Sequence, residues 1–373
     1  MYKVLFTSDY EIHGSGMGDP TELVVEPTTR MLDQFDRYGA KLTVMADVGE
    51  ILKFKEYRDT TGRDRFDFGG IQRQLERAVT TGHDVQLHLH SSYFNATWDE
   101  AKGYWKQDYR EYDLASLPYE RLREMIATGK RFLEETLRAK APGYECFAFR
   151  AANWSMHPSP DIVRALVECG LRIDTSVWKH GVYDDLVKFD YTRAHSDLVP
   201  WPVDASDVCR RDPDGKLFEF PIYTERQPIW VFLTANRVYR VVAQRLNPLP
   251  NPDAGAHGAG PMGGGGAPKG RGGPLGKLEK AAKMLLRPQP WKMDFNQCTG
   301  RQLVEGLKRV EARYGHPRHP LPFVLIGHSK TFTRLNERML APFLAYVKDN
   351  PDKYSFGTFA DFDPEVFRED RAA

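Results

Sequence analysis

The sequence predicts an α/β fold in which helices pack around a parallel sheet. Over residues 1–180, short apolar runs alternate with segments whose apolar residues recur at helical spacing, which is the pattern of repeated strand–helix units. Several helical segments end at a glycine directly before the next apolar run, as is common at helix C-termini. With 373 residues, 41% of them hydrophobic, the chain can bury one large core.

The expected elements of the first half follow this alternation. Apolar runs predict strands at residues 4–6, 42–45, 84–89, 147–149 and 171–173. Helical periodicity predicts helices at residues 28–38, 69–81, 119–138 and 160–169. Gly39, Gly82 and Gly170 are expected to let the chain turn from a helix into the following strand.

A segment of low complexity interrupts the second half of the chain. Residues 247–274 are rich in Gly, Pro and Ala and contain almost no large apolar residue, so burial cannot offset the entropy of ordering them. We therefore expect a disordered insertion at about 247–290 within one domain of residues 1–373. Beyond it, we expect a helix at 300–314, a strand at 323–326, a helix at 337–348 and a strand at 354–359.

Residues 276–287 combine leucines with basic residues at helical spacing. Leu278, Leu285 and Leu286 supply the apolar positions of this short amphipathic pattern. Such a helix can contact an anionic membrane weakly, here through residues 275–287, or it can be a solvated surface helix. The sequence leaves both interpretations open.

Composition argues against several classes of protein. The 52 Lys plus Arg nearly balance 51 Asp plus Glu, so we expect no nucleic-acid partner. The apolar run near the N-terminus is too short for a signal peptide, and the stretch at 229–233 is far below the roughly 20 residues that cross a bilayer. The four cysteines form no C-x-x-C pair, as expected for reduced thiols. We therefore expect a cytoplasmic protein without a transmembrane segment.

Two acidic residues follow the first predicted strand. Ligand sites of parallel α/β folds gather at the carboxyl ends of the strands. The spacing of Asp9 and Glu11 puts both carboxylates on one face if extended geometry continues. The pair suits a metal ligand beside a general base, or two ligands, although acidic residues at strand ends also cap helices or lie in solvent.

Two histidines lie at the end of the predicted strand 84–89. His88 and His90 are two residues apart, which again places both side chains on one side. Two imidazoles on one face suit zinc or a similar divalent metal. The alternative is a pair of hydrogen-bonded histidines near the surface.

Two further residues end later strands. His328 follows the strand at 323–326, and an imidazole there can donate a proton at neutral pH. Arg150 ends the strand at 147–149 and can hold a carboxylate with two hydrogen bonds. Taken alone, each is more often structural than functional.

The order of these residues resembles the motif series of the polysaccharide deacetylases, also called the NodB homology family or carbohydrate esterase family four. The similar stretches are TSDYE (7–11), GHDVQLHLH (82–90), FRAANW (149–154), GLRIDTS (170–176) and LIGH (325–328). The likeness covers roughly residues 1–180 and 295–360. The His-x-His form without an export signal looks most like the deacetylases of lipopolysaccharide and capsule biosynthesis clusters.

The resemblance implies a distorted (β/α)7-type barrel and a catalytic role for most of these residues. The first motif implies that Asp9 is the catalytic base and Glu11 a metal ligand. The others imply that His88 and His90 complete the site for a divalent metal, for which zinc is expected, and that His328 is the general acid. Two more catalytic residues are implied, namely Arg150, which would orient the base, and Asp174 in the fourth motif. The expected substrate-stacking residues are Trp154 and Trp178.

The sequence departs from the family pattern at three places. The usual His-x-x-x-His is His88-x-His90, with Ser92 at the second histidine position. The usual adjacent aspartates are Asp9 and Glu11, and Val177 occupies the place of a second acid near the fourth motif. These departures bear on the metal ligands and on the assignment of Asp174.

The reaction implied by the resemblance is hydrolysis of a carbon–nitrogen bond other than a peptide bond. An N-acetyl or O-acetyl group would leave a sugar, nucleotide sugar or lipid-linked glycan precursor of surface polysaccharide. One alternative is another metal-dependent amidohydrolase or a phosphoesterase, for which His180, His195 and His316 lack a comparable strand context. Another is a catalytically inactive carbohydrate-binding protein, which would not need both Asp9 and His328.

Overall fold

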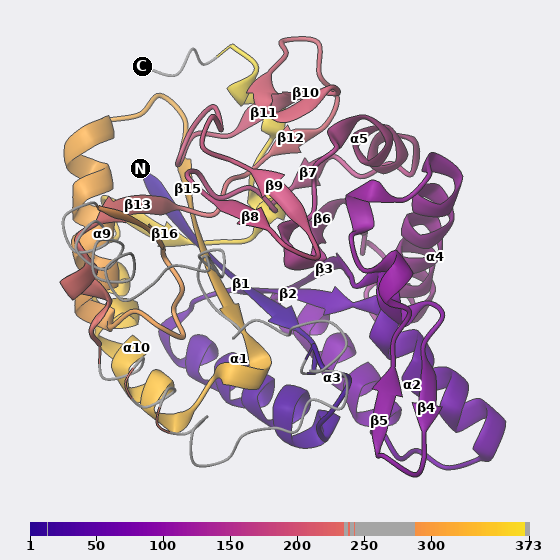
Figure 1. Cartoon of the computed structure of the whole chain (residues 1–373). Helices are drawn as coiled ribbons and strands as arrows, with labels where there is room; N and C mark the ends of the chain where they lie inside the picture. The colour runs from indigo at the N-terminus through magenta and orange to yellow at the C-terminus, as the bar shows by residue number, and fades with distance from the viewer. Residues whose placement is uncertain (13, 235–237, 239–241, 243–287, 370–373) are drawn as a thin grey trace, which may run out of the picture.

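A curled, largely parallel sheet forms the centre of the molecule (Figure 1). The computed structural model describes residues 1–12, 14–234, 238, 242 and 288–369. Within them the strand order of the main sheet is β11–β10–β12–β7–β6–β3–β2–β1–β15, and β16 pairs with β1. The parallel strands are β1 (Tyr2–Tyr10), β2 (Leu42–Asp47), β3 (Asp84–Leu89), β6 (Ala148–Ala151), β7 (Ile173–Asp174), β12 (Phe218–Glu219), β15 (Leu321–His328) and β16 (Tyr354–Phe356).

The two ends of the parallel region approach each other. Ile222, just beyond β12, forms a parallel bridge to Val324 of β15, and Asp294 forms another to Ile326. The antiparallel strands β10 (Trp201–Asp204) and β11 (Asp207–Arg211) extend the sheet beyond β12. The prediction of an α/β fold around a parallel sheet is confirmed, and the sheet is curled.

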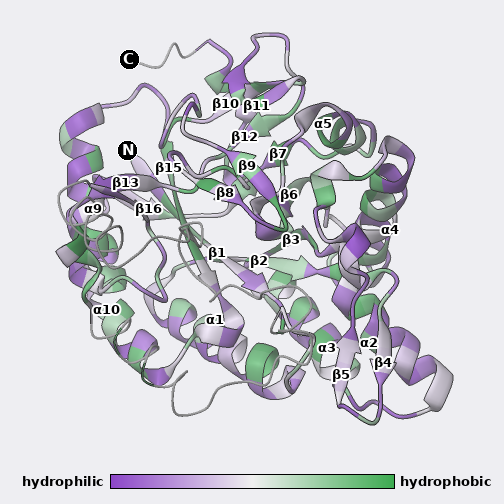
Figure 2. Cartoon of the chain, in the orientation of Figure 1, coloured by the Kyte–Doolittle hydropathy of each residue, from purple (hydrophilic) through white to green (hydrophobic). Residues whose placement is uncertain are grey.

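Helices cover the outside of this sheet (Figure 1). Figure 2 shows that several of them alternate hydrophobic and hydrophilic residues, as expected where one face packs on a core. Their bounds are Glu26–Tyr38 (α1), Val48–Thr61 (α2), Phe68–Thr80 (α3), Tyr119–Arg138 (α4), Ser159–Glu168 (α5), Gly300–Tyr314 (α9) and Arg334–Lys348 (α10).

Three short hairpins accompany the main sheet in the described residues. They pair β4 (Thr97–Asp99) with β5 (Tyr104–Lys106), β8 (Val182–Asp184) with β9 (Lys188–Asp190), and β13 (Thr224–Gln227) with β14 (Gln289–Lys292). The first residues of β14 fall inside the insertion predicted at about 247–290, so regular structure resumes slightly earlier than expected. The disorder predicted for 247–274 and the amphipathic helix predicted within 275–287 lie outside the described residues.

Most predicted helices and strands lie within a few residues of their expected places. Gly39 ends α1 with a φ of 69°, a left-handed conformation that glycine adopts without strain. Helix α10 begins earlier than expected because Thr333 and Asn336 form a capping box at its start. Helix α2 was not predicted, since its buried residues cluster in the first two turns instead of recurring along one face.

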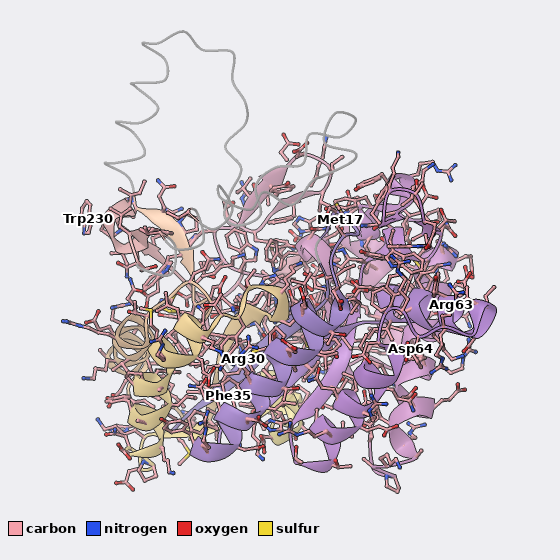
Figure 3. The ribbon with its side chains drawn as sticks, turned by 90° about the horizontal axis from the view of Figure 1, so that it is seen from below. Met17, Arg30, Phe35, Arg63, Asp64 and Trp230 are labelled. Carbon is pink, nitrogen blue, oxygen red and sulfur yellow. The ribbon has the colours of Figure 1, made fainter. Side chains whose placement is uncertain are left out.

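Helix α1 contacts both the loop that follows β15 and strand β1. Figure 3 labels Arg30 and Phe35 on α1, and the Arg30 guanidinium donates a hydrogen bond to the Phe332 carbonyl at 2.9 Å. Phe35 packs against Phe6 of β1 with ring centroids 4.6 Å apart.

In the described part of the chain, no helix is both long and apolar enough to span a bilayer.

Candidate metal centre and active site

The sheet register brings the predicted site residues to one edge. Residues paired across parallel strands project to the same face. Asp9 of β1 pairs with His328 of β15, while His88 of β3 pairs with Asp47 of β2 on one side and Arg150 of β6 on the other. These positions lie at the carboxyl ends of their strands.

Glu11, His88 and His90 form a group that could hold a metal ion. Their ligand atoms all lie within 4.8 Å of one another, and all three residues are buried. Glu11 Oε2 lies 2.5 Å from His90 Nε2 and 3.4 Å from His88 Nε2. One carboxylate and two imidazoles match the donor set of catalytic zinc sites.

The hydrogen bonding of His88 fits this role. Its Nδ1 lies 2.9 Å from the carbonyl oxygen of Arg150, and a carbonyl can only accept, so Nδ1 carries the proton. Nε2 faces Glu11 and, although buried, has no hydrogen-bond partner, so it is the nitrogen at which a metal ion could take the place of a proton. Metal-binding histidines are typically held through their other ring nitrogen in this way. The residues present therefore fit a divalent metal.

The electrostatics of the group also favour a bound cation. Burial alone lowers the pKa of His88, but the carboxylates of Asp9, Glu11 and Asp47 outweigh burial and raise it to about 9. Burial raises the pKa of Glu11, yet Lys330 and His90 hold it well below its usual range. The site thus keeps its carboxylate ionised and attracts positive charge.

Asp9 lies beside the metal group and is held by a buried arginine. Arg150 Nη1 donates to Asp9 Oδ1 at 2.8 Å, while its other donors bond to Thr7 Oγ1 at 2.8 Å and to the Thr175 carbonyl at 3.0 Å. Burial raises the pKa of Asp9, but Arg150 and the neighbouring histidines lower it overall. The second carboxylate oxygen of Asp9 lies 3.4 Å from His328 Nε2. An ionised carboxylate in this position can act as a base.

The backbone of His328 is held by Asn296, a residue that was not predicted from the sequence. Asn296 is fully buried, accepts a hydrogen bond from the His328 backbone N–H at 2.7 Å, and donates one to the His328 carbonyl at 3.3 Å. Burial lowers the pKa of the His328 imidazole. The stretch WKMDFN at 291–296, which follows the Gly-rich segment, was the available signal for Asn296.

Three charged residues around Glu11 were also missed. Lys330, whose side chain is 3% exposed, donates to Glu11 Oε1 at 2.6 Å and to the Ile12 carbonyl at 3.0 Å. Asp47 accepts from the His90 backbone N–H at 3.1 Å, and Glu50 accepts from the Ile12 N–H at 3.1 Å. Burial raises the pKa of both acids. Asp47 follows the strand predicted at 42–45, as Asp9 follows the one predicted at 4–6, and the same rule could have found it.

Asp174 has different partners. It pairs in register with Phe149, so it projects from the face opposite to Arg150, the next residue along β6. Its carboxylate accepts a hydrogen bond from Ser176 at 2.6 Å and interacts electrostatically with the carboxyl group of Glu219 of β12. Burial raises the pKa of both acids, as expected when two carboxyl groups share one proton. The structure does not bring Asp174 to the Asp9 group.

The two predicted aromatic residues lie against each other. Trp154 and Trp178 follow β6 and β7, and their rings are T-shaped with centroids 5.9 Å apart. Asn153 and Trp154 have φ values of 51° and 56°, which are uncommon for residues with a side chain and recur near functional sites. The aromatic pair therefore sits at the same edge of the sheet as Arg150.

A second group of possible metal ligands lies elsewhere. His157, Asp207 and Cys209 offer ligand atoms within 4.8 Å of one another. His157 Nε2 lies 3.1 Å from Asp207 Oδ1, and the same oxygen accepts from the Cys209 backbone N–H at 2.9 Å. His157 Nε2 and Asp207 Oδ1 thus already have hydrogen-bond partners. The Nε2 atom of His88, in contrast, has none.

Comparison with known proteins shows a shared fold. No protein-family model and no curated protein matches the sequence. The structure of a Mycobacterium smegmatis protein assigned as a polysaccharide deacetylase aligns with a TM-score of 0.50 and 14% identity, over 98% of this chain and 90% of that chain. One from Parabacteroides distasonis, assigned as a glycoside hydrolase/deacetylase, aligns with a TM-score of 0.52 and 11% identity, over 100% and 72%. At these identities the chain is similar to both in fold.

Proposed function

We propose that this protein is a divalent-metal-dependent hydrolase of the polysaccharide deacetylase superfamily. It would remove an N-acetyl or O-acetyl group from a sugar or glycan precursor. The observation that carries the proposal is the buried Nε2 of His88, which has no hydrogen-bond partner and lies 3.4 Å from Glu11 Oε2, next to an arginine-bound Asp9. The fold shared with deacetylase-assigned structures supports it.

Glu11, His88 and His90 are the proposed metal ligands, with zinc as the expected metal. When bound, the metal would supply Lewis acidity for the acyl oxygen and lower the pKa of an attacking water. Lys330 occupies one oxygen of Glu11 and leaves the other to face the histidines. Asp47 and Arg150 hold the His90 backbone and the His88 ring, so the ligand atoms keep their positions.

Asp9 and His328 are the proposed proton carriers. Asp9 is ionised at neutral pH because its pKa is lowered, and it would accept the proton of the attacking water. Arg150 keeps the Asp9 carboxylate in place during this step. Because burial lowers the pKa of His328, its imidazolium gives up a proton readily, here to the nitrogen or oxygen that leaves the acyl carbon. Acetate and an amine or alcohol result.

The finer features of the proposal rest on the sequence resemblance. They are a distorted (β/α)7 barrel, a single catalytic domain, a cytoplasmic location and a role in surface polysaccharide biosynthesis. Trp154 and Trp178 would stack on the sugar. Asp174 has no step in this proposal, because it projects from the other face of the sheet.

The test combines metal content with acetate release. Wild-type protein and the double variant His88→Ala plus His90→Ala would be analysed by plasma mass spectrometry. We expect near-stoichiometric metal in the wild type, its loss in the double variant, and acetate release from N-acetylated nucleotide or lipid-linked sugars by the wild type alone. Absence of metal from the wild type, even after zinc or cobalt reconstitution, would contradict the proposal.

A further inference from the structure

A buried lysine holds one oxygen of the proposed metal ligand Glu11. Lys330 lies in the short helical turn Ser329–Thr331 that follows β15, and its side chain is only 3% exposed. Its ammonium donates a hydrogen bond to Glu11 Oε1 at 2.6 Å and another to the carbonyl oxygen of Ile12 at 3.0 Å. One cation thus fixes both the carboxylate of Glu11 and the backbone of the next residue, through bonds that charge strengthens.

Glu50 holds the other backbone group of Ile12. This glutamate lies in the first turn of α2, and its two carboxyl oxygens lie 3.1 and 3.2 Å from the Ile12 nitrogen, whose N–H they accept. Glu50 and Ile12 are each 2% exposed. Buried backbone groups must be paired, and both groups of Ile12 are paired with side chains from distant segments. The chain directly after Glu11 therefore has little freedom to move.

The contact with Lys330 leaves Glu11 one oxygen for a metal. Oε2 faces the two imidazoles, 2.5 Å from His90 Nε2 and 3.4 Å from His88 Nε2. A carboxylate can bind a metal through one oxygen or through both. Use of Oε1 would break a charge-assisted hydrogen bond and deprive a buried ammonium of its counter-ion, which is unfavourable. Glu11 therefore presents Oε2 alone.

The number of ligand oxygens bears on which metal a site prefers. Zinc and similar ions take few ligands, and three protein ligands with one open position are usual in catalytic sites. Calcium takes about six to eight oxygens, often from carboxylates that bind through both oxygens. Magnesium and manganese favour octahedral sites rich in oxygen. A carboxylate limited to one oxygen, beside two imidazoles, therefore favours metals of the zinc class.

We propose that Lys330 and Glu50 are positioning residues that limit Glu11 to one ligand oxygen and so select metals of low coordination number. The selected class is zinc or cobalt, against manganese, magnesium and calcium. Both residues act through Glu11 and its neighbour Ile12, not on the reacting atoms. This inference deepens the proposed function and rests on it for the ligands Glu11, His88 and His90.

The test compares the binding of two metals and needs no turnover. Competition with a chelator would give the affinities of the full chain for Co²⁺ and Mn²⁺, in the wild type and in Lys330→Met. Loss of the ammonium makes the site more negative and favours both cations, so the ratio of the two affinities is the informative quantity. We expect the preference for cobalt to shrink by about tenfold, the lower end of the change when a partner of a metal ligand is lost.

The visible spectrum of bound cobalt gives a second readout. Tetrahedral Co²⁺ absorbs more strongly than Co²⁺ of higher coordination number. We expect weaker absorption in Lys330→Met, because Glu11 Oε1 becomes available as a ligand, and the wild-type spectrum in Lys330→Arg, which keeps a cationic donor. Lys130→Met is the matched control, since Lys130 on α4 also pairs with one carboxylate, Glu134 at 3.1 Å, and donates to one backbone carbonyl, that of Cys146. Its metal preference and spectrum should be those of the wild type.

Variants of Glu50 keep the test decisive if Lys330→Met does not fold. Glu50→Gln retains an acceptor for the Ile12 N–H and should bind both metals nearly as the wild type does. Glu50→Leu removes the acceptor and should bind both metals about 10–100-fold more weakly. Because both variants lack the same carboxyl group, the difference between them reports the hydrogen bond to Ile12.

Two results would overturn this inference. One is a Lys330→Met protein with the metal preference and the cobalt spectrum of the wild type, and the other is equal metal affinity in Glu50→Gln and Glu50→Leu. Either result, with metal bound to the wild type, leaves the proposed hydrolase function in place. A wild type that binds neither metal removes the hydrolase proposal, and this inference with it.

Discussion

Asp9 and Glu11 at the carboxyl edge of the parallel sheet and Asp84 at its amino end are all buried, but their pKa values shift in opposite directions. At the carboxyl edge, Asp9 and Glu11 are 4% and 5% exposed, and their pKa values are lowered because Arg150 and Lys330 outweigh burial. At the amino end of β3, Asp84 is 9% exposed, and burial raises its pKa to about 7. The difference shows that burial alone disfavours the charge, and that a cation in direct contact with the carboxylate reverses this for Asp9 and Glu11.

The surroundings of Asp84 make the contrast clearer. Its Oδ1 accepts hydrogen bonds from the Val85 N–H and the Gln86 side chain, while its buried Oδ2 has no hydrogen-bond partner. It lines a cavity of about 330 Å³ with Tyr144 and Phe147. Cations thus keep Asp9 and Glu11 ionised, whereas burial raises the pKa of Asp47 and Glu50 at the same edge and of Asp84 at the amino end.

Asp9→Asn is expected to have the largest effect. The amide keeps an oxygen for the Arg150 guanidinium but cannot accept a proton at neutral pH. Acetate release should therefore fall by about 10²–10⁴-fold, the usual contribution of a general base. Metal content should remain that of the wild type, because Asp9 is not a proposed ligand. Unchanged turnover in this variant would remove Asp9 from the mechanism.

Arg150→Met tests the cation that holds Asp9. The change leaves the buried Asp9 carboxylate without its main partner, and breaking a buried ion pair from one side costs about 3–5 kcal/mol. Urea unfolding monitored by circular dichroism would measure the loss. Arg172→Met is the control, since Arg172 pairs with Glu145 in a half-exposed ion pair, and little change is expected there. Equal losses of unfolding free energy in the two variants would show that Arg150 does not stabilise the buried carboxylate of Asp9.

Asn296→Ala tests the support of His328. Because Asn296 bonds to both backbone groups of His328, its loss should shift the imidazole and lower turnover by about 10–100-fold. Metal content should not change, which distinguishes a positioning role from a general loss of structure. Asn350→Ala, on the C-terminal side of α10, is the matched control with wild-type turnover expected. A variant that loses metal and turnover together would argue against a specific role at His328.

Asp84→Asn should have the smallest effect, and its sign depends on pH. The folded pKa of about 7 lies above the ordinary value of 3.8, so folding is favoured most when Asp84 is protonated. The stability of the wild type should fall as pH rises between these two values, by roughly 2 kcal/mol from about pH 5 to pH 8. The amide removes this dependence, so the variant should be more stable than the wild type at pH 8. Parallel unfolding curves for both proteins across this range would contradict the raised pKa.

The strands and helices that position the site could be predicted from the sequence more accurately than the contacts within the site. Period-two spacing and the ends of apolar runs located Asp9, Glu11, His88 and His90, because strand geometry alone puts such residues on one face. Asp174 shows the limit of this approach. Its face depends on the register with Phe149, and the register between strands cannot be read from a single strand.

The residues that were missed contribute through partners far away in the sequence. Lys330 reaches Glu11 across 319 positions, and Asn296 reaches His328 across 32. Helix α2 lacked an apolar stripe because Glu50 is buried at its start, where it accepts the Ile12 N–H. Such contacts follow from tertiary packing and leave no periodic signal in the sequence.

The most direct test of the central claim is anomalous diffraction from crystals of the zinc-loaded protein. We predict a single strong peak within about 2.0–2.2 Å of Glu11 Oε2, His88 Nε2 and His90 Nε2. A peak at the group formed by His157, Asp207 and Cys209 instead, or no peak at the carboxyl edge of the sheet, would contradict the account.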